Sequence, residues 1–197
     1  LTITKGVTMM GGWDGSPTGA VVVDPEAYPT VFDGVDTYRI FEINETSGNQ
    51  VTISGFTFIN GYHDVRAGAI DIVNGNVDIL NSSFTNNLGG SYAGAIYIAT
   101  AGEVNILNNS FSGNSATYGG GHIYAGSASS GTLIEGNVFS GGSANYGAVI
   151  HSDRCNLTVN RNFIKDTGSG SVIDIYSYGP TVVISNNIIV RSTNQAM

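Results

Sequence analysis

A short pattern recurs at nearly regular intervals along this chain of 197 residues. Each copy begins with an aliphatic residue and carries a bulky apolar residue five positions later, and four of the six copies have asparagine three positions after the aliphatic residue. Successive copies start 25 to 28 residues apart, at Ile53, Ile79, Ile106, Ile134, Val159 and Ile184. A period of this length, built from strand-like pieces and turn residues, predicts a solenoid whose turns bury one another's apolar faces.

Three short strands are predicted in each repeat. An alternating apolar pair such as Leu157 and Val159 comes first, and a corner with asparagine and a strand with a bulky apolar residue follow. After a loop that is usually rich in glycine, a second alternating pair such as Ile173 and Ile175 completes the unit. Strands of period two between Gly and Asn corners are typical of a parallel β-helix, and the length of the chain predicts about seven turns.

The whole chain, residues 1–197, is predicted to form one β-helix domain. Residues 31–197 carry the repeat, whereas residues 1–30 do not show it clearly and are expected to form an atypical first turn that covers open strand edges. Trp13 is expected to lie over that end of the core. Because the chain opens with Leu1 and shows no charged and apolar leader, we expect it to be a segment of a larger surface protein.

The corner asparagines are expected to stack, because successive turns of such a helix lie about 4.8 Å apart. Stacked side-chain amides can bond to the amides above and below, which satisfies polar groups that are buried away from water. Ser82 and Phe56 occupy the same column in earlier turns, so the ladder should stop there. The ladder residues are Asn109, Asn137, Asn162 and Asn187. The neighbouring aromatic stack is predicted to consist of Phe84, Phe111 and Phe139.

Two motifs carry a resemblance to a known family. Phe84-Thr85-Asn86-Asn87 looks like the FxxN motif, and Ala67-Gly68-Ala69-Ile70 looks like the paired GGAI motif; both recur one repeat later. Together they resemble the repeats of polymorphic outer-membrane-protein-like adhesins and, more broadly, bacterial right-handed parallel β-helix surface proteins. The resemblance implies a right-handed helix and an extracellular or cell-surface location. It implies no chemistry, because this fold hosts both enzymes and inert shafts.

Charge and composition exclude several classes of partner. The net charge is −8, and the seven basic residues are scattered without forming a stripe, so nucleic acid and strongly polyanionic polysaccharides are not expected as partners. The longest aliphatic runs are only about four residues, so membrane insertion is not expected either. No motif for a metal or a cofactor is present, and neither is expected.

A candidate ligand-binding stripe lies on the outward positions of the second alternating strand, preceded by Glu42. Counting in steps of two also places His122 on this face, because it lies two residues before Tyr124. His151 can face inward or outward depending on a one-residue change of register. We favour the outward position, because an unpaired polar ring in an apolar core is costly. The candidate residues are Asp71, Tyr97, His122, Tyr124, His151 and Asp174.

A second column of aromatic residues is expected beside this stripe. Tyr92, Tyr118 and Tyr146 each precede the loop that leads into the second alternating strand. Their rings can pack the loops together, and stacking on a sugar is the alternative role.

The stripe is compatible with three functions. The first is a non-catalytic surface module for adhesion or carbohydrate binding, with surface glycans as its partner. The second is a polysaccharide lyase, epimerase or glycosidase that uses tyrosine, histidine and acid side chains as acid and base. Only Arg154 among the basic residues is expected near the stripe, which disfavours a lyase acting on uronates, and no catalytic residue is assigned. The third is a spacer or fibre segment that associates end to end through open strand edges, including the end at 194–197.

Overall fold

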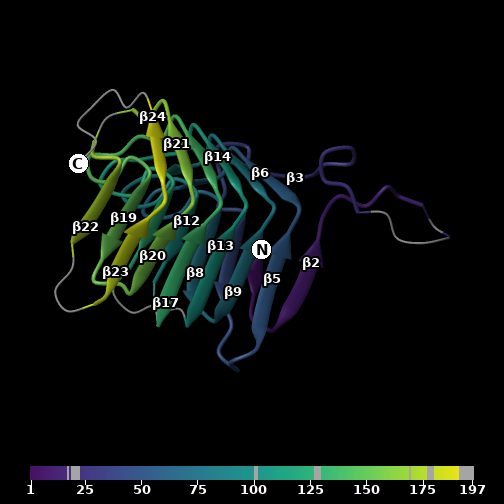
Figure 1. Ribbon diagram of the computed structural model, residues 1–197. Coiled ribbons are helices and arrows are strands. Elements are labelled where there is room, and N and C mark those ends of the chain that lie inside the picture. Colours follow the sequence, from purple (N-terminus) through teal and green to yellow (C-terminus); the bar gives the residue numbers. More distant parts are fainter. Residues whose placement is uncertain are drawn as a thin grey trace.

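The chain forms a stack of parallel strands that coils along one axis (Figure 1). The computed structural model describes residues 1–16, 18, 23–99, 102–126, 130–168, 170–176 and 180–190. Within these residues there is no helix, and three sheets of seven strands each run the length of the stack. The predicted all-β parallel β-helix with three strands per turn is therefore confirmed. Seven strands per sheet amount to six complete turns and part of a further one, slightly fewer than predicted.

Sheet 1 carries the candidate site, and sheet 2 follows it along the chain in every turn. Sheet 1 contains, in stacking order, β1 (Thr2–Ile3), β4 (Phe41–Asn44), β8 (Ile70–Asn74), β12 (Ile96–Ile98), β16 (Ile123–Ala125), β19 (Ile150–Asp153) and β22 (Ile173–Tyr176). Sheet 2 contains β2 (Val7–Met10), β5 (Gln50–Ser54), β9 (Asn76–Leu80), β13 (Glu103–Leu107), β17 (Gly131–Glu135), β20 (Leu157–Asn160) and β23 (Val182–Ser185).

Sheet 3 completes each turn, and a short fourth sheet accompanies it in the first half of the stack. Sheet 3 contains β3 (Thr30–Asp33), β6 (Phe56–Ile59), β10 (Ser83–Thr85), β14 (Ser110–Ser112), β18 (Val138–Ser140), β21 (Phe163–Lys165) and β24 (Ile188–Val190). Sheet 4 contains β7 (Tyr62–His63), β11 (Leu88–Gly89) and β15 (Ser115–Ala116). We call the strands at one level of the stack a rung.

The core between the sheets is built from columns of like residues. Phe84, Phe111 and Phe139 are fully buried and stacked, with ring centroids 4.9 Å and 4.8 Å apart. Phe58 extends this stack by one rung toward the N-terminus. The predicted aromatic column is confirmed, and its spacing follows from the hydrogen-bonding distance between strands.

The predicted asparagine ladder is also confirmed. At each step the side-chain oxygen of one asparagine accepts bonds from the backbone and side-chain N–H groups of the asparagine in the preceding rung, as between Asn137 and Asn109 (2.8 Å and 3.1 Å). The same pattern joins Asn137 to Asn162 and Asn162 to Asn187. Toward the N-terminus the ladder ends at Ser82, whose backbone N–H donates to Asn109. These bonds satisfy the side-chain amides and backbone N–H groups of a corner that is almost completely buried.

A second, shorter ladder was not predicted. Asn87 and Asn114, which end the two segments that resemble FxxN, are fully buried and bonded to each other across one rung (2.9 Å). Each also donates to the carbonyl of a phenylalanine in the preceding rung, Phe58 and Phe84 respectively. The motif therefore supplies an aromatic residue to the core and an amide to the following corner.

The glycine of the GGAI motif is required by crowding between rungs. A Cβ atom at Gly94 would lie 2.3 Å from the carbonyl oxygen of Gly121 and 2.4 Å from the backbone nitrogen of Ser115. Both are backbone atoms of a neighbouring rung, so they cannot move aside without separating strands. By contrast, a Cβ atom at Gly131 on sheet 2 would meet nothing within 4 Å.

We expect Gly94→Ala to lower the free energy of unfolding by about 1–3 kcal/mol, the usual cost of overpacking a close-packed interior. Gly131→Ala is the matched control and should change stability by less than about 0.5 kcal/mol. Urea denaturation followed by circular dichroism measures both values. Equal effects of the two substitutions would contradict the role assigned to the crowded corner.

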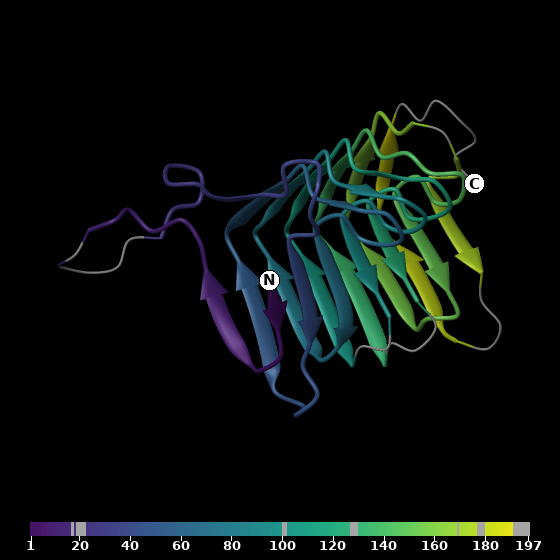
Figure 2. The same cartoon turned by 180° about the vertical axis from the view of Figure 1, so that it is seen from behind.

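The first rung is more regular than predicted. β1 and β2 pair in parallel register with β4 and β5, and only the segment between β2 and β3 departs from the repeat. The described part of this segment extends away from the N-terminal end of the stack (Figure 2). The prediction that Trp13 covers the core is wrong, because its side chain is 53% exposed and its backbone pairs with Val23 instead. The predicted open end at 194–197 lies outside the described residues.

Candidate functional site

Sheet 1 brings most of the predicted site residues into one outer column. Backbone pairing places Tyr97 beside Asp71 on one side and beside Tyr124 on the other. Tyr124 in turn pairs with His151, and His151 pairs with Asp174. Residues more than 100 positions apart in the sequence thus lie within five successive rungs. We call the outer column the residues Glu42, Asp71, Tyr97, Tyr124, His151 and Asp174.

His122 does not belong to this column, and the prediction that it faces outward is wrong. Its side chain is fully buried between the rings of Phe111 and Phe139, and its Nδ1 accepts a hydrogen bond from the amide of Asn114 (3.0 Å). The strict alternation used for the prediction fails because the chain turns a corner just before β16. Two consecutive residues, His122 and Ile123, therefore both face inward.

His122 takes the place of a further member of the short ladder. In the next rung the ladder position is Gly142, where a Cβ atom would lie 2.6 Å from Nε2 of His122. The imidazole thus fills space that an asparagine would need, and it accepts the bond that Asn114 would otherwise give to that residue. Burial lowers the pKa of His122 to about 3, although a bond with the Ser140 backbone opposes this shift. The role of His122 is structural.

His151 faces outward as predicted but is covered by other side chains. Only 5% of the residue is exposed, because its ring stacks on Tyr124 and lies against the rings of Tyr118 and Tyr146. Its Nδ1 lies 2.7 Å from a carboxylate oxygen of Asp174. Burial lowers the pKa of His151, whereas Asp174 opposes that change. At neutral pH the imidazole is therefore uncharged.

The predicted second aromatic column provides this cover. Tyr92, Tyr118 and Tyr146 lie in the loops that lead into sheet 1, and neighbouring rings are 5.2 Å and 5.0 Å apart. Gly119 rather than Tyr118 pairs with Tyr92 and Tyr146 along the backbone, which leaves room above Gly119 for the His151 ring. Tyr118 and Tyr146 remain 45% and 47% exposed. We call these two exposed rings the aromatic platform.

The N-terminal end of the outer column is a compensated ion cluster. Asp71 is fully buried, and its carboxylate lies 3.1 Å from Arg39 and 3.0 Å from Arg66. Arg39 also pairs with Glu42, and the guanidinium of Arg66 lies 5.0 Å from the centre of the Tyr97 ring. The prediction that only Arg154 lies near the stripe is therefore wrong. These cations neutralise the acids beside them and cover one face of Tyr97.

The C-terminal end of the column contains two carboxylates with different partners. Asp153 binds Arg154 (2.9 Å) and accepts a long hydrogen bond from the Tyr124 hydroxyl (3.4 Å). Burial, with a smaller effect of the Asp153 charge, raises the pKa of Tyr124 above its ordinary value. Asp174 contacts only the neutral His151 among the ion pairs of the described residues. Its side chain is 32% exposed, and it contacts His151, against which the platform rings pack.

These protonation properties disfavour acid–base catalysis at the column. A tyrosine base works best with a pKa near the operating pH, whereas the pKa of Tyr124 is shifted in the opposite direction. His151 is nearly inaccessible beneath the platform, and the described residues contain no group of three or more acid, histidine or cysteine side chains suited to a metal ion. The accessible features are two aromatic faces and one carboxylate.

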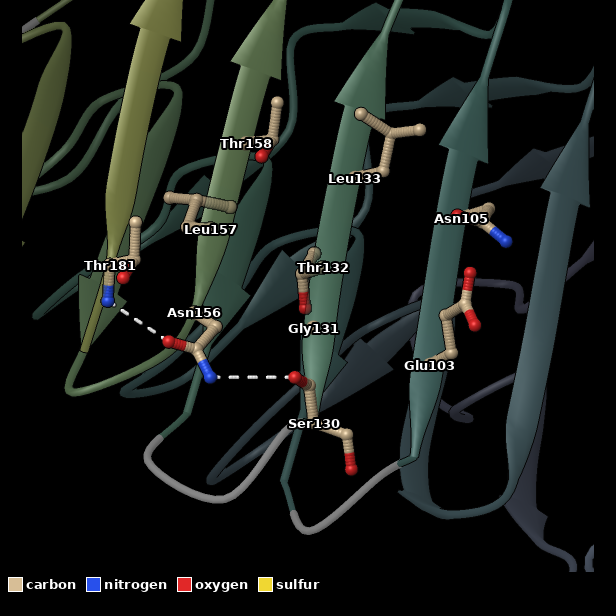
Figure 3. A pocket seen from close by; sticks show the side chains of 10 residues that line it. All are labelled: Glu103, Asn105, Ser130, Gly131, Thr132, Leu133, Asn156, Leu157, Thr158 and Thr181. Carbon is tan, nitrogen blue, oxygen red and sulfur yellow. Dashed lines mark hydrogen bonds between the residues drawn. The ribbon is translucent and has the colours of Figure 1, made fainter.

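A separate hollow lies on the outer face of sheet 2. Its floor is at Gly131, flanked by Glu103 on one side and Asn156 on the other (Figure 3). The amide of Asn156 is bonded at both ends, to the carbonyl of Ser130 and the backbone N–H of Thr181. The remaining lining residues are polar apart from Leu133 and Leu157. Sequence reasoning did not predict this hollow. The one feature of the sequence that indicates it is Gly131, which has no side chain to fill the space.

The fold and its outer face define a β-helix module with an aromatic and acidic surface patch. Residues 40–197 match the family model described as a right-handed β-helix region, and the chain belongs to this family. The match supports the predicted handedness. No curated protein and no solved structure matches the chain. In the part of the chain that the structure describes, no helix could span a membrane.

Proposed function

We propose that this chain is a non-catalytic glycan-binding module that acts outside the cell or at its surface. The observation that carries the proposal is the pair of half-exposed tyrosine rings, Tyr118 and Tyr146, held 5.0 Å apart on adjoining turns. Tyrosine is enriched at binding surfaces, because its ring offers a large contact area that is apolar with a polar tip. The C–H faces of a pyranose ring can pack on such rings while its hydroxyl groups remain in water.

The scaffold supports this role because it holds the platform rigidly. Tyr118 and Tyr146 rest on His151, which is packed against Tyr124 in the outer column. The column itself belongs to a sheet whose inward positions are buried from β4 to β19 and partly buried in β22. A site on such a support loses little conformational freedom when a ligand binds. Adhesion to surface glycans is the biological role that we infer from these properties.

Removing a platform ring should weaken glycan binding. We expect Tyr118→Ala and Tyr146→Ala each to raise the Kd of a bound oligosaccharide about tenfold, the usual effect of truncating an aromatic contact residue. A glycan array would identify the oligosaccharide, and calorimetry would give the Kd values. Tyr38→Ala is the matched control, because Tyr38 is 67% exposed but does not belong to the platform.

Three results would contradict the proposal in different ways. If no oligosaccharide binds, the module is not a glycan receptor. If binding occurs but neither platform substitution affects it, the ligand lies elsewhere, with the sheet 2 hollow as the next candidate. Turnover of a bound polysaccharide would refute the non-catalytic assignment and favour the lyase or glycosidase alternative.

A further inference from the structure

We propose that the glycan recognised by the aromatic platform carries a free amino group, as in an unacetylated hexosamine, whose ammonium ion binds Asp174 beside the tyrosine rings. This inference rests on the proposed function, because it concerns the ligand of the same site. The inference follows from a comparison of the acidic side chains on this face. Most of them pair with an arginine, whereas Asp174 pairs with the imidazole of His151.

The other acids of the outer column, and the nearby Asp153, already have a basic partner. Glu42 and Asp71 pair with Arg39, and Asp71 also pairs with Arg66. At the other end, Asp153 pairs with Arg154. Asp174 is the exception, because its ion-pair partner among the described residues is the imidazole of His151.

The imidazole does not neutralise Asp174 at neutral pH. Burial under the platform lowers the pKa of His151, so the neutral ring predominates at this pH and provides no full positive charge beside the carboxylate. His151 Nδ1 contacts one carboxylate oxygen, Oδ2. The side chain is partly exposed, so a ligand cation can reach it from solvent without displacing a protein group.

The tyrosine rings add a second attraction for the same ion. An ammonium group near the face of a tyrosine ring is drawn to the negative π-system, and the contact strengthens when it is partly desolvated. Tyr146 and Asp174 both contact His151, so the platform and the carboxylate are linked through one side chain. In the proposed complex the sugar stacks on the rings and its ammonium group reaches Asp174.

Other classes of glycan fit this surface less well. A uronate would face Asp174 and Asp153, and the nearest guanidinium, that of Arg154, is already paired with Asp153. Neutral and N-acetylated sugars can stack on the rings, but they leave the charge of Asp174 without a partner. The expected order of affinity is therefore free amine first, neutral and N-acetylated sugars second, and uronate last.

Calorimetry with four matched hexasaccharides tests the proposal: oligomers of glucosamine, N-acetylglucosamine, glucose and glucuronate. At pH 6.5 a substantial share of the sugar amines is protonated, and because burial lowers the pKa of His151 its neutral form predominates. We expect the glucosamine oligomer to bind about tenfold more tightly than the glucose oligomer, as for a single ammonium contact with a carboxylate and an aromatic ring. The advantage should shrink in concentrated salt, which screens partly exposed charges.

The variant Asp174→Asn keeps the size of the side chain and removes its charge. It should lower the affinity for the glucosamine oligomer to that for glucose, while glucose binding stays unchanged. Unchanged glucose binding also shows that the variant is folded. Glu103→Gln makes the same charge change on sheet 2 and should leave the preference for the amine intact.

The outcomes separate this inference from the proposed function. If glucosamine, N-acetylglucosamine and glucose oligomers bind equally well, the amine preference is refuted while glycan binding stands. A preference that survives in Asp174→Asn refutes the role of this carboxylate. If none of the four oligomers binds, the amine preference is refuted, and the proposed function fails as well only if the glycan array also gives no ligand.

Discussion

Replacing Asn137 with alanine is expected to lower the free energy of unfolding by about 3–5 kcal/mol, because the change leaves several buried polar groups without partners. The Asn137 amide donates to the Ile106 carbonyl and to Asn162, and its oxygen accepts two bonds from Asn109. The residue is only 1% exposed, so water cannot replace these bonds. The loss should propagate to both neighbouring rungs.

Chemical denaturation of the wild type and the variant measures this effect. The control is Asn145→Ala, which removes an exposed asparagine from a loop and should change stability by less than about 0.5 kcal/mol. A loss of less than about 1 kcal/mol in Asn137→Ala would show that the ladder contributes little, and that hydrophobic stacking alone holds the rungs together.

Acid is expected to destabilise the fold strongly through His122. The unfolded chain binds a proton on this residue near pH 6.5, whereas the folded chain binds it only near pH 3. Between these values the unfolded state binds more protons, so the free energy of unfolding falls as the pH falls. The full loss is roughly 4–5 kcal/mol from this residue, at about 1.4 kcal/mol for each pH unit. His151, whose pKa is also lowered, acts in the same direction.

Comparing the pH dependence of stability in the wild type and in His122→Leu isolates this contribution from that of the carboxylates. The variant loses the acceptor for the Asn114 amide, which should cost about 1 kcal/mol at pH 7. Its stability should then fall less steeply between pH 6.5 and pH 4. Parallel curves for the two proteins would contradict the assignment of a neutral, buried imidazole.

The fold was predictable because a β-helix repeats the same geometry in every turn. Aliphatic residues at a period of two mark the buried strands, and residues 25 to 28 positions apart become neighbours in adjacent rungs. The positions of Asn109 and Asn137 in the repeat were enough to predict both the ladder and the rung spacing. Such strong periodicity leaves few alternative registers.

The error at His122 shows where periodicity stops being informative. The corner before each strand of sheet 1 places two consecutive residues inward, as at Ala69 and Ile70 or Val149 and Ile150. Small or aliphatic residues precede the isoleucine in those rungs, so aligning the repeats by their isoleucine could have indicated a buried site for His122. Counting in steps of two across a corner could not have indicated that His122 is buried.

The surface of the site depends on long side chains rather than on the repeat. The burial of Asp71 by Arg39 and Arg66, and of His151 by Tyr118 and Tyr146, follows from loop conformations and rotamers. Sequence spacing predicts which rung these residues occupy but not how far their side chains reach. The charge compensation that singles out Asp174 was therefore visible only in the structure.

The most direct test of the account is an NMR titration of the tyrosine ring resonances with the glucosamine hexasaccharide. The account predicts that the Tyr118 and Tyr146 signals shift together and saturate at one Kd, while those of Tyr38 stay unchanged. Binding that leaves the two platform rings unaffected, or that shifts the Leu133 methyl signals of the sheet 2 hollow instead, would contradict it.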